Sequence, residues 1–375
     1  MIQAGIYIHI PFCKIKCMYC DYYSIINREQ DIPAFVEMLI KEIEIIARNH
    51  EKVWVFDTIF FGGGTPSLME PRWMEKIMNA LETSFDISNV KEITKEANPG
   101  EAPMDSLIEF RKLGINRLSI GFQSLQPQLL TFLSRIHRSE DCLTTFRNAR
   151  DAGFENINID MIYNIPRQSL EMWQTDLKQI IELAPNHISA YSLTVETNTT
   201  LHTQVQHGNI HMPSDEIDLA MFEFCQKYLC HHNYEQYEIS SYSKTNMECQ
   251  HNLHYWKLEP YLAFGPSAHG YDGHVRWWNT SSLDEYVQML RDNKRPMSGS
   301  EILSQSDHLN ELIFNGLRTR EGIQMHKMDE WDTTSQTIKY VLNKWDSQLD
   351  IGTDTIRLKK DAYKFADEIA IDLMH

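Results

Sequence analysis

The sequence Ile6-Tyr-Ile-His-Ile-Pro-Phe-Cys13-Lys-Ile-Lys-Cys17-Met-Tyr-Cys20 joins a strand-like run to a cluster of cysteines. Residues 6–10 have the short apolar pattern of a buried strand. The three cysteines follow in a C-x3-C-x2-C spacing, and soft thiolate sulfur suits iron–sulfur clusters and zinc. Three thiolates can hold three irons of a 4Fe-4S cluster and leave the fourth iron open to a small molecule. Structural zinc is the weaker alternative, because it normally needs a fourth protein ligand, from His9 or from a distant residue.

The composition is that of an ordinary globular protein, with 42% hydrophobic and 23% charged residues in 375. No run of eighteen apolar residues occurs, and the chain opens directly into a strand-like run, so we expect neither a membrane span nor a targeting peptide. A net charge of −17 argues against nucleic acid as a partner. The chain is long and its seven cysteines are not evenly paired, which favours a reducing, cytoplasmic compartment over a secreted disulfide scaffold.

The first two hundred residues alternate between strand and helix patterns. Six such units predict a parallel sheet with right-handed crossovers and helices outside it. The pattern alone does not separate an open doubly wound sheet from a complete or partial barrel. The predicted strands cover residues 6–10, 57–61, 90–97, 117–121, 156–160 and 187–195.

The pattern changes after about residue 200. A helix is predicted over residues 215–231 and a short strand over 234–240, whereas glycine and proline favour a loop over 250–278. Residues 284–291 are assigned to a linker. The last segment combines helices (307–317 and 335–342) with a short strand (355–359), which indicates a small helical or winged-helix-like domain.

Polar residues and glycines follow the predicted strands, where sites form in sheets of this kind. The strand ends carry the cysteines, Gly62-Gly63-Gly64, Glu96, Gln123 and Asp160. The glycines either bring main-chain groups close to a ligand or serve only a tight turn. The two carboxylates suit the hydroxyls or the ammonium group of a small ligand, although isolated carboxylates are more often solvated residues or helix caps.

Together these motifs resemble the radical S-adenosylmethionine (SAM) superfamily, in particular the branch of oxygen-independent coproporphyrinogen III oxidase and the HemW haem chaperones. The similarity covers roughly residues 1–280. The resemblance implies an α/β fold: a partial (β/α)6, TIM-like barrel with a small helical or winged-helix-like C-terminal domain. It divides the chain into a radical SAM core (1–235), a haem-motif segment with a linker (236–300) and a C-terminal helical domain (301–375). The matching motifs are Tyr7–Cys13, Cys17–Cys20, Gly62-Gly-Gly-Thr-Pro66, Glu96-Ala-Asn-Pro99, Gly121-Phe-Gln-Ser124, Asn158-Ile-Asp160 and His251-Asn-Leu-His-Tyr-Trp256.

The resemblance also implies two cofactors. A 4Fe-4S cluster would be held by Cys13, Cys17 and Cys20, and its open iron would bind the amino and carboxylate groups of SAM. The implied SAM contacts, which need not all touch one SAM molecule, are Tyr7, Tyr19, Gly63, Gly64, Thr65, Glu96, Gln123, Arg135, Asp160 and Thr194.

The last motif separates the two members of this branch. His251-Asn-Leu-His-Tyr-Trp256 matches the H-N-x-x-Y-W motif of the HemW group. This match implies that the protein binds haem and that His251 is a ligand of the haem iron. His254 is the competing iron ligand, and the alternative for His251 is a purely structural role. Lys257 and Arg276 are candidates for contact with the haem propionates. Two departures argue against the oxidase: Asp21 and Tyr22 follow Cys20 where the oxidase has a fourth cysteine, and its N-terminal extension is not present. The other four cysteines, Cys142, Cys225, Cys230 and Cys249, are interpreted as ordinary thiols.

The expected function is therefore that of a haem chaperone that passes haem to acceptor proteins, for example in a respiratory chain. The resemblance adds peripheral membrane contact and a homodimer as implied properties. The alternative function is that of an oxygen-independent coproporphyrinogen III oxidase. A third possibility is a structural metal-binding domain without SAM chemistry.

Overall fold

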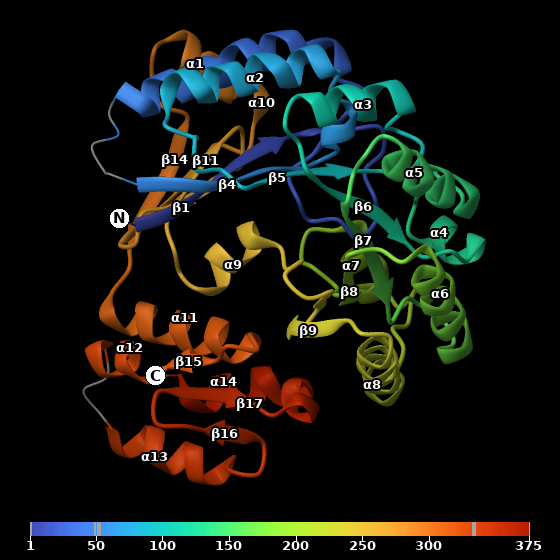
Figure 1. The fold of residues 1–375 in the computed structure, drawn as a ribbon, viewed down its shortest axis with the longest axis vertical. Coiled ribbons are helices and arrows are strands. Elements are labelled where there is room, and N and C mark those ends of the chain that lie inside the picture. The colour runs from blue at the N-terminus through green and yellow to red at the C-terminus, as the bar shows by residue number, and fades with distance from the viewer. Residues whose placement is uncertain (1, 49, 51–53, 332–334, 375) are drawn as a thin grey trace.

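Six adjacent parallel strands form the centre of the structure, which is a computed structural model that describes residues 2–48, 50, 54–331 and 335–374 (Figure 1). Each strand pairs with the next one in this series, as expected when each is followed by a crossover helix. The six strands are β1 (Ile2–Ile10), β4 (Trp54–Gly63), β5 (Glu92–Ala97), β6 (Arg117–Gln123), β7 (Asn156–Tyr163) and β8 (His187–Ser192).

Further strands extend both edges of this sheet. Beside β8 lie β10 (Ser241–Ser243) and β9 (Glu235–Glu238). Beside β1 lie β11 (Tyr261–Phe264), which runs parallel to it, and then β12 (His269–Tyr271), β13 (Val275–Asn279) and β14 (Met297–Ile302). The prediction of a loop over residues 250–278 is therefore wrong. Glycine was misleading there, because Gly270 belongs to β12, where the indole of Trp277 would lie 2.3 Å from any Cβ.

Helices cover the outer face of the curved sheet, while α9 (Gln250–Trp256) lies inside the curve (Figure 1). The outer helices bury apolar stripes, such as Phe35, Leu39 and Ile43 of α1, against the strands. The partial barrel implied by the resemblance is confirmed. The outer helices are α1 (Ile32–Arg48), α2 (Pro71–Ser84), α3 (Met104–Lys112), α4 (Pro127–Phe132), α5 (Ser139–Asp151), α6 (Leu170–Leu183), α8 (Asp215–His231) and α10 (Leu283–Arg291).

The supposed linker over residues 284–291 is instead helix α10, which packs against α1. Its Tyr286 and Leu290 are fully buried in the same core as the barrel strands. Because this helix is short and its sequence is mostly polar, its apolar stripe is difficult to recognise from the sequence. The three-part division of the chain stays a prediction.

The C-terminal region has its own core and a small sheet, in the winged-helix-like arrangement that was expected. Ile313, Leu317, Ile356 and Ile369 are fully buried in this second core. No helix within the described part of the chain combines the length and the apolarity needed to cross a bilayer. The elements of the region are α11 (Gln305–Arg318), β15 (Ile323–Gln324), α12 (Met325–Trp331), α13 (Ser335–Lys344), β16 (Leu349–Ile351), β17 (Thr355–Leu358) and α14 (Ala366–Leu373).

A buried carboxylate, Glu42 of α1, ties this helix to the edge of the barrel. It accepts hydrogen bonds from the Tyr286 hydroxyl (2.6 Å), the Asn279 Nδ2 atom (2.6 Å) and the Gly265 N–H (2.8 Å). Burial raises the pKa of Glu42 to about 7, although these three donors favour its charged form. The network joins α1 and α10 to the turn after β11.

We expect Glu42→Ala to lower the free energy of unfolding by about 3 kcal/mol, because three buried donors lose their acceptor. Urea unfolding followed by circular dichroism measures the change. Glu37→Ala, on an exposed position of the same helix, is the matched control and should change the value by less than about 0.5 kcal/mol. Equal effects of the two variants would contradict the role assigned to Glu42.

Candidate functional site

The three cysteines line one small cavity at the exit of β1. Cys13 ends the short strand β2 (Phe12–Cys13), which pairs with β3 (Ile25–Ile26), and Cys17 and Cys20 of the following loop line the same cavity. The Cys13 Sγ atom lies 3.3 Å from the Thr65 hydroxyl, and the Cys17 Sγ atom accepts a hydrogen bond from Arg135 Nη1 at 3.6 Å. Burial raises the pKa of the Cys13 and Cys20 thiols, so binding of a metal cluster would release protons.

This all-sulfur donor set suits an iron–sulfur cluster better than zinc. Among the described residues, no three His, Cys, Asp or Glu side chains converge closely enough to hold one metal ion. Three free thiols around a cavity, rather than around a single point, are what a cluster needs when each sulfur binds a different iron.

The glycine turn after β4 lies against the strand exit that carries the cysteines. The Gly64 N–H donates to the Ile10 carbonyl and the Thr65 N–H to the Phe12 carbonyl, both at 2.8 Å. Gly63 has a φ of +107°, and a Cβ there would lie 2.5 Å from the His9 ring. The sequence left open whether these glycines serve a turn or a ligand. They make the tight turn, and Gly63 and Gly64 also line the adjoining cavity.

A polar cavity of about 340 Å³ adjoins the cysteine corner, with Cys20 on its rim. It collects residues from the ends of β4, β5, β6, β7 and β8, as the convergence of strand ends predicted. Tyr22, Asn98, Ser119, Tyr191 and Glu196 also line it but were not predicted as contacts. Nine of the ten predicted SAM contacts line this cavity: Tyr19, Gly63, Gly64, Thr65, Glu96, Gln123, Arg135, Asp160 and Thr194.

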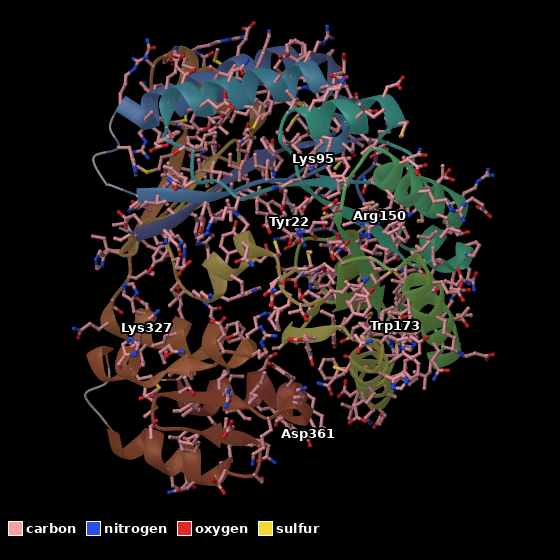
Figure 2. The ribbon with its side chains drawn as sticks, in the orientation of Figure 1. Tyr22, Lys95, Arg150, Trp173, Lys327 and Asp361 are labelled. Carbon is pink, nitrogen blue, oxygen red and sulfur yellow. The ribbon has the colours of Figure 1, made fainter. Side chains whose placement is uncertain are left out.

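Two carboxylates make the inner end of this cavity acidic. Successive residues of β5 point to opposite faces. Lys95 packs on the ring of Phe110 of helix α3 and so lies on the helix side, and Figure 2 labels Lys95 between the sheet and the helices; Glu96 therefore points inside. Burial and the nearby charge of Asp160 raise the pKa of Glu96 to about 8. Asp160 accepts hydrogen bonds from Ser119 (2.8 Å) and from Asn158 (2.7 Å). This end is therefore suited to hydroxyl groups and cations.

Arg135 makes the other end basic. Its Nη2 atom donates to Asn98 Oδ1 (2.5 Å) and to the Gly121 carbonyl (3.1 Å), which holds the guanidinium beside the cysteines. Gln123, at the end of β6, has a φ of +69° next to a break in the strand register. Such local strain is common at ligand sites. The cavity thus offers a cation near the sulfurs and two carboxyl groups farther in.

A second cavity of about 280 Å³ lies deeper in the barrel and shares Glu96, Asp160 and Tyr22 with the first. Figure 2 shows Tyr22 within the curve of the sheet. Tyr7, the remaining predicted SAM contact, lines this inner cavity instead of the outer one. So does Arg117, which is 2% exposed and whose side-chain Nε atom has no hydrogen-bond partner among the described residues. The one sign of Arg117 in the sequence is a charge within an otherwise apolar predicted strand.

The H-N-x-x-Y-W motif forms helix α9, which closes the inner cavity through Asn252 and Tyr255. His251 is 0% exposed; its Nδ1 atom is hydrogen-bonded to Thr58 (2.9 Å) and its Nε2 atom to the Tyr255 hydroxyl (2.8 Å). Burial lowers its pKa well below the usual value, so the ring is neutral. Both nitrogens are therefore in use, and the role of His251 as an iron ligand stays a prediction.

His254, the competing ligand, is held between two carboxylates. Its Nε2 atom lies 2.7 Å from Asp57 Oδ1 and its Nδ1 atom 2.6 Å from Glu259 Oε2. Burial alone would lower the pKa of His254, but the hydrogen bonds and charges of the two acids outweigh it and raise the pKa to about 9. Both nitrogens then carry protons and leave no lone pair for iron.

The cations expected to meet haem propionates already have partners in the protein. Lys257 lies 3.4 Å from Glu321, and Arg276 makes two 2.8 Å contacts with Glu311. Of the four cysteines interpreted as ordinary thiols, Cys230 is exposed and the other three are buried.

Comparison with known proteins assigns the family. A family model described as the radical SAM superfamily matches residues 7–180. "Heme chaperone HemW" of Bacillus subtilis (strain 168) is 34% identical over 329 residues, covering 86% of each chain. This chain belongs to the radical SAM superfamily and, within it, to the HemW family. "Radical S-adenosyl methionine domain-containing protein 1, mitochondrial" of Danio rerio is 33% identical over 86% of this chain and 74% of its own.

The fold also matches a solved structure, that of coproporphyrinogen III oxidase (HemN) from Escherichia coli, with a TM-score of 0.85 over 99% of this chain and 90% of that one. The identity is 21%, so this similarity concerns the fold. Membership of the radical SAM superfamily implies a 4Fe-4S cluster and SAM as cofactors.

We expect Gly63→Ala to abolish loading of the cluster, because the added Cβ meets the His9 ring and separates the glycine turn from the cysteine corner. Iron and sulfide content after anaerobic reconstitution measures the effect. Gly153→Ala is the matched control: its φ is +89°, but a Cβ there has nothing within 4 Å, so only backbone strain of about 1 kcal/mol is added. Full cluster content in Gly63→Ala would show that cluster loading does not depend on the contact between the glycine turn and the cysteine corner.

The pKa of His254 predicts how stability depends on pH. Since the folded value of about 9 exceeds the ordinary 6.5, the stabilisation is complete below pH 6.5 and is lost as pH rises through 9. The loss amounts to about 3 kcal/mol at most. Urea unfolding at stepped pH should show this fall in the wild type and a flatter curve in His254→Gln. His207→Gln, at an exposed position, should keep the wild-type curve; the same curve in His254→Gln would mean that His254 is not a buried cation.

Proposed function

We propose that this protein is a haem chaperone of the radical SAM type, which holds a 4Fe-4S cluster, SAM and haem and transfers the haem to acceptor proteins. The observation that carries the proposal is the continuity of the cysteine corner, the polar cavity and the H-N-x-x-Y-W helix α9. In this arrangement the cluster site, the SAM cavity and the haem motif follow one another through the barrel.

The residues of the corner and the cavity have complementary roles. Cys13, Cys17 and Cys20 would hold the cluster, and Arg135 would offset negative charge beside the Cys17 sulfur. Asp160, a carboxylate that lines the cavity, suits ribose hydroxyls, and Glu96 suits the cationic part of SAM. When bound, the cluster supplies one-electron reduction of the SAM sulfonium.

The haem-transfer part of the proposal is supported by relatives. The similar proteins of Bacillus subtilis and Lactococcus lactis are both named heme chaperone HemW, and this chain covers 86% and 83% of them. We place the protein in the cytoplasm, with haem-acceptor proteins of the respiratory chain as its partners, a homodimeric state and peripheral membrane contact. An oxygen-independent coproporphyrinogen III oxidase is the competing function, and the HemN-like fold is compatible with it.

The proposal is tested with anaerobically reconstituted protein. We expect iron and sulfide in cluster stoichiometry, a Soret band on titration with ferric haem, and transfer of this haem to an apo-haemoprotein. Replacement of Cys13, Cys17 and Cys20 by serine should remove the iron, whereas Cys230→Ser, at an exposed thiol elsewhere, should retain it.

The same protein is also incubated with coproporphyrinogen III, reductant and SAM. Formation of protoporphyrinogen at enzymatic turnover would overturn the chaperone assignment in favour of the oxidase. Zinc as the sole metal after anaerobic purification would overturn both functions.

A further inference from the structure

A groove rich in aromatic side chains lies between the barrel edge and the C-terminal region. Its volume is about 440 Å³, which is in the usual range for ligand sites. Tyr255 and Trp256 of α9 form one wall, and Tyr261 and Tyr271 of β11 and β12 continue it. Helix α11 supplies the opposite side through Glu311 and Asn315. We call this the aromatic groove.

One histidine, His269 of β12, lines the aromatic groove within the described part of the chain. It is exposed, and its ring stacks on Trp278 with centroids 5.9 Å apart and an interplanar angle of 25°. Neither of its ring nitrogens makes a hydrogen bond or an ion pair with any described residue. In contrast, His251 and His254 have both nitrogens occupied. His269 is therefore the histidine near the motif whose lone pair is available without a rearrangement.

The walls of the aromatic groove suit a flat, apolar macrocycle. Aromatic rings stack on such a ligand, and a histidine nitrogen is a common axial ligand of haem iron. Two contacts with α11 hold the width of the groove: the Nη2 atom of Arg276 of β13 donates to both carboxylate oxygens of Glu311, and Arg318 of α11 lies 4.5 Å from the centre of the Trp256 ring.

Tyr255 joins the aromatic groove to the cofactor cavities. Its side chain lines both this groove and the inner cavity, and its hydroxyl is hydrogen-bonded to His251 Nε2 at 2.8 Å. The motif thus forms a partition, with Asn252 on the cofactor side and Trp256 on the groove side.

We propose that haem binds in the aromatic groove with His269 as the iron ligand, and that His251 is a positioning residue that orients Tyr255 in the wall of the groove. This inference rests on the proposed haem function and makes it specific. In this proposal the H-N-x-x-Y-W motif shapes the haem site, and a residue outside the motif binds the iron.

The test titrates ferric haem into the wild type, His269→Ala, His251→Ala and the control His274→Ala, an exposed histidine that does not line the groove. We expect His269→Ala to weaken haem binding by about tenfold or more and to lose the electron paramagnetic resonance signature of a histidine ligand. Added imidazole should restore that signature. His251→Ala and Tyr255→Phe should keep it, although His251→Ala binds more weakly, and His274→Ala should behave as the wild type.

A second variant tests the place rather than the ligand. Asn315→Trp fills the aromatic groove from α11 and should abolish haem binding, while circular dichroism and cluster content stay as in the wild type. Unchanged haem binding by this variant would overturn the assignment of the groove.

The outcomes separate this inference from the proposed function. If the wild type binds haem and His269→Ala retains both its affinity and its histidine signature, the inference fails and the chaperone function stands. The inference also fails if His251→Ala alone loses the signature. If the wild type binds no haem, the proposed function fails and the inference fails with it.

Discussion

The contact between the exit of β1 and the glycine turn after β4 determines the geometry of the site. Two main-chain hydrogen bonds of 2.8 Å, from Gly64 and Thr65, hold the two segments together, and the His9 ring fills the space that a Cβ at Gly63 would need. The cysteine loop begins at this contact, and the polar cavity lies directly beside it. The three cysteines and the residues that line the polar cavity are far apart in the sequence and are therefore positioned relative to each other by backbone packing.

Charge is distributed along the cavity in a way that suits an asymmetric ligand. Arg135 lies beside the sulfurs, whereas Glu96 and Asp160 lie farther in, at partly buried positions where the charge of Asp160 raises the pKa of Glu96. Burial of two carboxylates is unfavourable unless hydrogen bonds or a cation compensate. The donors from Gly63, Ser119 and Asn158 compensate in part, and a bound cation would complete this compensation.

Three histidines, two on α9 and one on β12, show how environment decides whether an imidazole can bind iron. His251 is neutral and enclosed, His254 is a cation between two acids, and His269 is exposed on a stacked tryptophan. Only a nitrogen with a free lone pair can coordinate a metal, so hydrogen-bond partners limit ligand choice as strongly as position does. The H-N-x-x-Y-W helix then separates two cavities, with Tyr255 as the shared wall.

The sequence by itself determined the parallel α/β core, the cysteine triad and the strand-end residues of the polar cavity, whereas other predicted contacts, such as Tyr19 and Arg135, came from the family resemblance. These features depend on local pattern, because strand ends in such sheets meet at one edge and Glu96, Gln123 and Asp160 each lie in the C-terminal half of a recognisable strand. The tertiary structure decided the edge strands within residues 250–278, the place of Tyr7 in the inner cavity and the partners of the histidines. The bonds from Thr58 to His251 and from Asp57 to His254 span 193 and 197 residues, and no local pattern encodes a partner at that distance. Burial and protonation of a histidine depend on such partners, so only the folded chain fixes which imidazole is available to a metal.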